Sequence, residues 1–134
     1  MSAFFDSNIL IYAYSTDVRR QRALTTIAGG GVISAQVLNE FTNALRRKQK
    51  QDWAVIEAAV QSVRFRFPDI VPLTAHTHAA ALALARDHAL AFYDALIVAA
   101  AIEAGCDTLY SEDLQHSRSI GGLAIVNPFQ GGVP

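Results

Sequence analysis

The 134-residue sequence has one cysteine, Cys106, and therefore cannot form an internal disulfide. Nothing in it requires an oxidising compartment, and we interpret Cys106 as a small buried apolar residue. Charged residues are also scarce, at 17% of the chain against 51% hydrophobic residues. This balance argues against disorder and predicts one compact domain with a core of its own.

Long apolar runs are missing as well. No run reaches the ~20 residues of a membrane-spanning helix before it meets a charge. The apolar N-terminus is interrupted by Asp6 and lacks a basic flank, so we expect no targeting segment, no membrane contact and a cytoplasmic location. An excess of basic residues is absent too, because the formal net charge is −1. Any affinity for nucleic acid must therefore come from a local arrangement of charges.

Short apolar runs alternate with longer helical patterns, which predicts an α/β fold with a mainly parallel sheet covered by helices. Strands are expected near 3–5, 32–33, 70–73, 108–111 and 124–126. Helices are expected after residue 6 and over 19–28, 35–48, 52–67, 74–88 and 95–102. We expect Trp53 and Phe67 in the core, and Pro72 predicts that its strand lies at a sheet edge. Residues 1–128 are taken as the domain and 129–134 as a loosely ordered tail.

Two acids follow predicted strands. Asp6 comes directly after the run 3–5, and Asp113 comes after the strand that ends at Ser111. In open α/β sheets, sites form at the carboxyl ends of the strands, so both side chains are expected at one edge. Taken alone, Asp6 has an ordinary alternative explanation as the N-cap of the helix that follows it.

Two further acids are expected on helices that pack over this edge. Asp94 opens the segment 95–102, which is apolar on all sides and typical of a buried helix, where an unpaired carboxylate would cost several kcal/mol. Glu40 lies beside the core face of helix 35–48, although a plain surface residue is the alternative for it alone. Four carboxylates in one crevice would raise one another's pKa unless a cation lay among them. Oxygen ligands without thiolate or imidazole select Mg²⁺ or Mn²⁺, ions suited to phosphodiester chemistry.

The segment Asp6-Ser7-Asn8, then Glu40, then Asp94 with 95–101, and finally Ser111-Glu112-Asp113 together resemble the acidic signature of the PIN-domain ribonucleases. Within this family the chain is most similar to the VapC toxins of type II toxin–antitoxin systems. The resemblance implies a single three-layer α/β/α domain with a short, mainly parallel central sheet. It also implies a Mg²⁺- or Mn²⁺-dependent endoribonuclease acting on RNA, a VapB-like antitoxin as its inhibitor, and a homodimer.

The resemblance implies roles for individual residues. The metal-binding and catalytic carboxylates would be Asp6, Glu40, Asp94 and Asp113. Asn8 and Ser111 would support them by orienting carboxylates or a metal-bound water. Glu112 is an additional acid whose direction stays open, and His116 is either near the mouth of the site or an ordinary surface histidine.

A polar stripe on helix 35–48 offers a path for RNA. Gln36, Glu40, Asn43 and Arg47 recur at helical spacing beside the core face. We expect Asn43, Arg46 and Arg47 to contact RNA phosphates along this stripe. A solvated helix end remains the alternative for the basic cluster, since cations suit the C-terminal end of a helix dipole.

Two other enzyme classes fit less well. A haloacid-dehalogenase-type phosphatase needs a second Asp two residues after the first, where this chain has Asn8. A receiver domain needs a late lysine, and no lysine follows Lys50. The alternative that stays open is a non-catalytic PIN-like interaction module. The loss of one of the four signature acids would favour it, and all four are present.

Overall fold

The computed structural model describes residues 2–130, in which single strands alternate with pairs of helices and three strands end the order, giving six strands and six helices in these residues. The strands are β1 (Ala3–Phe5), β2 (Ile33–Ser34), β3 (Ile70–Val71), β4 (Thr108–Tyr110), β5 (Ser119–Ile120) and β6 (Leu123–Val126). The helices are α1 (Ser7–Ala13), α2 (Arg20–Ile27), α3 (Ala35–Arg47), α4 (Trp53–Arg66), α5 (Ala75–His88) and α6 (Phe92–Glu103). The predicted α/β class is confirmed. None of the described helices has both the length and the apolar character needed to cross a membrane.

The sheet is mainly parallel, as predicted. Its central strands lie in the order β1-β4-β6-β5, with β1, β4 and β6 parallel and β5 antiparallel to β6. A parallel bridge between Phe4 and Val32 joins β1 to the parallel pair β2–β3. In the described part of the chain β3 pairs with β2 alone, so it is the edge strand that Pro72 predicted.

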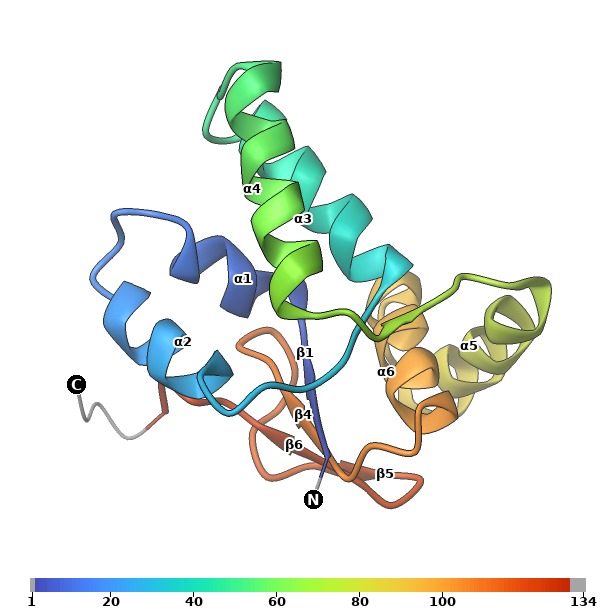
Figure 1. Cartoon of the computed structure of the whole chain (residues 1–134). Coiled ribbons are helices and arrows are strands. Elements are labelled where there is room, and N and C mark those ends of the chain that lie inside the picture. Colours follow the sequence, from blue (N-terminus) through green and yellow to red (C-terminus); the bar gives the residue numbers. More distant parts are fainter. Residues whose placement is uncertain (1, 131–134) are drawn as a thin grey trace.

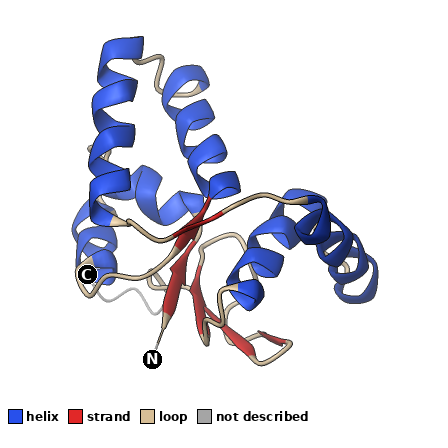
Figure 2. Ribbon diagram, turned by 45° about the vertical axis from the view of Figure 1, so that its right-hand side comes forward, coloured by secondary structure: helices blue, strands red, loops and turns tan. Residues whose placement is uncertain are grey.

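Helices pack on both sides of this sheet. Figure 1 shows α1 and α2 on one side and α5 and α6 on the other. Helices α3 and α4 pack on each other and extend as a pair beyond the strands, which Figures 1 and 2 both show. The carboxyl ends of β1 and β4 therefore lie where α1, α3 and α6 come together.

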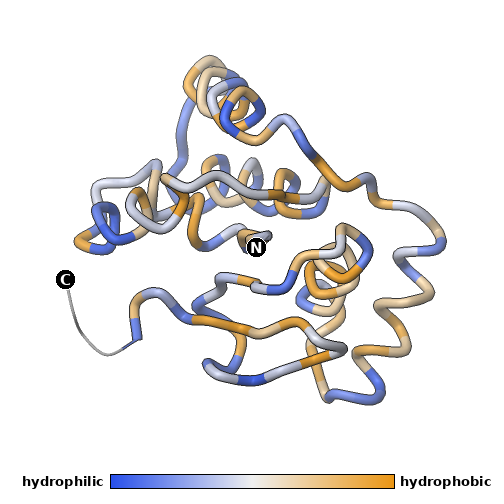
Figure 3. Tube along the Cα trace, turned by 60° about the horizontal axis from the view of Figure 1, so that its bottom comes forward, coloured by the Kyte–Doolittle hydropathy of each residue, from blue (hydrophilic) through white to orange (hydrophobic). Residues whose placement is uncertain are grey.

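The core lies between the sheet and these helices. Its largest fully buried side chains include Phe4, Phe41, Phe67 and Leu109. Residues 95–101 of α6 are all buried, as their apolar sequence predicted, and Cys106 is buried too. In the hydropathy-coloured trace, β6 is hydrophobic along its length (Figure 3).

Several local predictions are wrong. Trp53 is 56% exposed, because it begins α4 at the far end of the helix pair, where no sheet covers it. Helix α6 begins at Phe92 rather than at Asp94, which lies in the first turn, where a carboxylate also suits the helix dipole. Strand β5 was not predicted, since it has only two residues and is completed by a hairpin with β6. The predicted tail over 129–134 falls mostly on residues 131–134, which lie outside the described residues.

Candidate metal centre

Asp6 lies between the end of β1 and the start of α1. Its backbone N–H donates to Tyr110 O at 3.0 Å, which ties the ends of β1 and β4 together. Its carboxylate Oδ1 accepts from Ser7 N at 2.6 Å, so Asp6 is also the N-cap of α1. The residue is only 2% exposed, unlike an ordinary cap at the surface. The Asp6 carboxylate is therefore both the N-cap of α1 and a buried acid at the site.

Three of the four predicted acids meet at one point. Asp6, Asp94 and Asp113 each offer a carboxylate oxygen, and these oxygens all lie within 4.8 Å of one another. Asp113 comes from the loop after β4, and Asp94 comes from the first turn of α6. Asp6 is buried, Asp94 half-buried and Asp113 exposed, so the cluster opens to solvent on the Asp113 side.

The two predicted supporting residues both contact the cluster. Asn8 Nδ2 lies 3.1 Å from Asp113 Oδ2 and 3.4 Å from Asp6 Oδ2, and its Oδ1 accepts from Glu112 N. Ser111 Oγ donates to Asp6 Oδ2 at 2.7 Å and accepts from Asp113 N at 3.2 Å. Asn8 and Ser111 therefore bridge the carboxylates that end β1 and follow β4.

Glu40 lies beside the cluster rather than in it. Its Oε1 accepts from Ser7 Oγ at 2.8 Å, and its Oε2 accepts from Gln36 Nε2 at 3.1 Å. Ser7 Oγ in turn lies 3.4 Å from Asp6 Oδ1, so the hydroxyl separates the two acids. The sequence predicted no separate role for Ser7, and its position directly after Asp6 gave no sign of a contact with α3.

Burial dominates the electrostatics of the site. It raises the pKa of Asp6 from 3.8 to about 7, a change that the charges of Glu40 and Asp113 increase and the hydrogen bonds from Ser111 and Ser7 N oppose. Burial also raises the pKa of Asp94, again with help from Asp113 and Glu40. A divalent cation would relieve both effects, and the all-oxygen donor set fits a hard ion such as Mg²⁺ or Mn²⁺.

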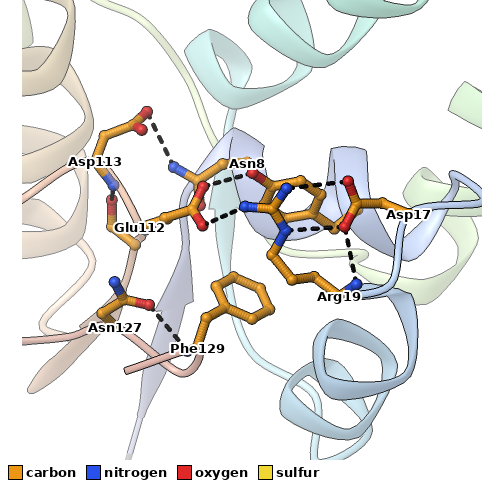
Figure 4. A network of polar contacts seen from close by, with 9 residues as sticks. Asn8, Asp17, Arg19, Glu112, Asp113, Asn127 and Phe129 are labelled. Carbon is orange, nitrogen blue, oxygen red and sulfur yellow. Dashed lines mark hydrogen bonds and ion pairs between the residues drawn. The ribbon is translucent and has the colours of Figure 1, made fainter. Parts of the chain in front are cut away.

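Glu112 faces a different partner from its neighbour Asp113 (Figure 4). Its carboxylate accepts from the Tyr12 hydroxyl and from Arg19 Nη1, the latter at 3.0 Å. Arg19 also bonds both carboxylate oxygens of Asp17, and its guanidinium lies 4.2 Å from the centre of the Tyr12 ring. The question that the sequence left open is answered, because the Glu112 side chain is held by α1 and the α1–α2 loop.

The residues proposed to contact RNA have different surroundings. Arg46 lies over the Trp53 ring at 4.5 Å and donates to Gln51 O, whereas Arg47 is exposed at the end of α3. Asn43 is exposed and lines a pocket with Glu40. His116 is exposed, and its Nδ1 accepts from Asn127 N at 3.0 Å.

Comparisons with known proteins agree with this architecture. Residues 3–119 match the family model of the PIN domain. The crystal structure of Mycobacterium tuberculosis VapC20, described as a sarcin–ricin loop cleaving toxin, has a TM-score of 0.71 at 21% identity, over 84% of this chain and 90% of that one. A toxin–antitoxin complex from Klebsiella pneumoniae has a TM-score of 0.73 at 22% identity, over 96% and 98%.

A DNA-bound VapBC complex from Salmonella typhimurium has a TM-score of 0.65 at 17% identity, over 93% of this chain and 96% of that one. Comparison with curated proteins finds no match. These structures share the fold, and the family model covers most of the sequence, including β1, α3, α6 and the loop after β4. The chain belongs to the PIN domain family.

Proposed function

We propose that the protein is a Mg²⁺- or Mn²⁺-dependent endoribonuclease that hydrolyses RNA phosphodiester bonds. The observation that carries the proposal is the buried carboxylate of Asp6, whose pKa is raised to about 7 and which lies within 4.8 Å of those of Asp94 and Asp113. Such an arrangement destabilises a protein unless a cation balances the charges, and carboxylates with strongly perturbed pKa values are typical of functional sites.

The residues around the proposed ion have two roles. Asp6, Asp94 and Asp113 would hold the ion, and Asn8 and Ser111 would fix the directions of Asp6 and Asp113 through their hydrogen bonds. A bound divalent ion would lower the pKa of its water ligand and neutralise charge on the phosphate.

We keep Glu40 among the proposed catalytic residues, although it lies beside the three clustered carboxylates. Its carboxylate is only part-buried and is held by hydrogen bonds from Ser7 and Gln36. This position on α3 places its carboxylate at the rim of the site, where the two hydrogen bonds orient it.

We further propose that the protein is the toxin of a VapBC-type pair in the cytoplasm, assembles as a homodimer and is inhibited by a VapB-like antitoxin. The antitoxin partner is supported by the neighbouring structures, several of which are toxin–antitoxin complexes. An antitoxin peptide that brought a basic side chain to the three carboxylates would oppose their mutual repulsion as a metal does.

The test separates a nuclease from a non-catalytic interaction module. Labelled single-stranded RNA is incubated with chelator-treated protein, with and without Mg²⁺ or Mn²⁺. We expect metal-dependent cleavage that Asp94→Asn reduces by more than about 100-fold, beyond the usual ~10–100-fold cost of losing an outer partner of a metal ligand. Asp69→Asn, an exposed acid elsewhere, is the matched control.

Titration calorimetry of the same proteins gives an independent readout of the ion. Asp94→Asn should bind Mg²⁺ or Mn²⁺ more weakly than the wild type, and Asp69→Asn should bind it equally well. Tight metal binding by the wild type with no cleavage of any RNA would favour the interaction module. Cleavage that persists in chelator would contradict the metal-dependent mechanism.

A further inference from the structure

A second concave surface adjoins the metal centre, between α3 and the start of α6. It has a volume of about 440 Å³ and is lined by Gln36, Asn39, Glu40, Asn43 and Tyr93. This volume is within the range of pockets that bind small organic groups. Glu40 belongs to both the pocket and the acidic set, and Tyr93 directly precedes Asp94, so a group bound here would lie next to the metal-binding carboxylates.

Tyr93 provides the aromatic wall of this pocket. The residue is 64% exposed, and its ring contacts the ring of Phe92 edge-on at 5.9 Å between centroids. Phe92 in turn packs against His78 at 5.1 Å, so the tyrosine rests on an ordered aromatic neighbour. A lone exposed tyrosine needs no explanation, but this one lines a pocket beside the carboxylates.

Side-chain amides form the opposite wall. Gln36 Nε2 donates to Glu40, and Asn39 Nδ2 lies 3.4 Å from Gln36 Oε1, so these two amides are oriented by their neighbours. Within residues 2–130 the Asn43 amide makes no hydrogen bond, which leaves a donor and an acceptor facing solvent. The lining described here includes no lysine or arginine, so the pocket does not have the composition of a phosphate site.

We propose that this pocket binds one unstacked nucleobase of single-stranded RNA, with Tyr93 as the stacking platform and Asn43 as a donor and acceptor to the edge of the base. The inference rests on the proposed nuclease function, because a base is expected here only if its phosphate lies at the metal centre. Aromatic stacking with amide contacts to an exposed edge is how unpaired bases are recognised. The pocket therefore selects which phosphodiester is cut, and Asn43 contacts a base rather than a phosphate.

A binding experiment tests the stacking contact. All variants are made in the Asp94→Asn background so that the RNA stays intact, and the probe is a short single-stranded RNA containing one 2-aminopurine. With this parent protein we expect quenching of the fluorescence on binding. Tyr93→Ala should weaken binding roughly 10- to 100-fold and remove the quenching, whereas Tyr93→Phe should keep both within about threefold. Phe65→Ala removes an exposed aromatic on α4, outside the pocket, and should bind as the parent does.

Two results would overturn the proposal. The first is no binding or no quenching with the parent protein, and the second is equal RNA binding by the Tyr93→Ala variant. If equal binding is accompanied by a change in oligomeric state, measured by light scattering, Tyr93 contacts a second copy of the chain instead.

A cleavage experiment separates this proposal from the nuclease proposal. Protein with intact carboxylates is given a pool of RNA randomised around the cut position, and products are sequenced. Asn43→Ala should reduce the discrimination in kcat/KM between bases at one position beside the cut, by roughly 5- to 100-fold. If cleavage occurs with the same preference in Asn43→Ala and Tyr93→Ala, the pocket proposal fails and the nuclease proposal stands. If RNA binding depends on Tyr93 but nothing is cleaved, the nuclease proposal fails, and with it the selection of a cut position, while base binding by the pocket is retained.

Discussion

Neutralising Asp6 should stabilise the metal-free protein, and the effect should depend on pH. Burial raises the pKa of this carboxyl from 3.8 to about 7. At about 1.4 kcal/mol for each pH unit between the two values, ionisation of the buried group costs about 4 kcal/mol of folding free energy. The Asp6→Asn variant has no charge to bury and avoids this cost.

The direction in which stability changes with pH follows from proton binding. Between pH 4 and 7, the folded state holds the Asp6 proton more tightly than the unfolded state does, because its pKa is about 7 rather than 3.8. The contribution of Asp6 to stability is therefore fully present below about pH 4 and is lost as the pH rises toward 7. The asparagine would place an amide donor near Ser111 Oγ and Asn8 Nδ2, and the poorer hydrogen bonding costs about 1–2 kcal/mol. We expect a net gain of about 2–3 kcal/mol for the variant at pH 8.

Urea unfolding between pH 5 and 8, in chelator, measures this difference. The gap between wild type and Asp6→Asn should grow with pH, and Asp69→Asn, an exposed acid, should show no such growth. Adding Mg²⁺ or Mn²⁺ should stabilise the wild type in proportion to the logarithm of its concentration and leave Asp6→Asn nearly unchanged. A gap that stays constant from pH 5 to 8 would refute the argument that burial raises the pKa of Asp6.

Three further outcomes are expected. Arg47→Ala should weaken RNA binding and lower its salt dependence by about one counterion, with metal affinity unchanged, in titrations at several salt concentrations. Arg19→Ala should change the urea midpoint little, because its ion pair with Glu112 is partly exposed, and calorimetry should show weaker metal binding through the displaced loop. Phe67→Ala should cost about 3–5 kcal/mol and Trp53→Ala less than about 1 kcal/mol, and equal costs would contradict the different burial of the two rings.

The convergence of the acids was predictable because it follows from the topology. Parallel strands bring their carboxyl ends to one edge, so the acids that follow β1 and β4 meet whenever those strands are neighbours, as the pairing of Phe5 with Tyr110 makes them. The apolar segment of α6 likewise fixes where Asp94 lies. These inferences need only periodicity and the direction of the chain.

Other features could not be predicted, because they depend on distant parts of the chain. Tyr12 and Glu112 are 100 residues apart, and no local pattern indicates that they hydrogen-bond. The contact of Ser7 with Glu40 similarly requires the packing of α1 on α3. Trp53 was misplaced because α4 carries apolar residues on several sides, while part of the helix pair extends past the sheet and remains exposed.

The surroundings of Asp6 lower the stability of the metal-free protein and suit a bound cation. The hydrogen bonds from Ser111 Oγ and Ser7 N favour the ionised form of its carboxylate, yet burial outweighs them and raises the pKa to about 7. The same bonds would hold the carboxylate in place for an ion, which would replace the missing solvation. Stability and metal affinity should therefore move in opposite directions at this residue, so that a more stable Asp6→Asn protein is also one that neither binds the ion nor cuts RNA.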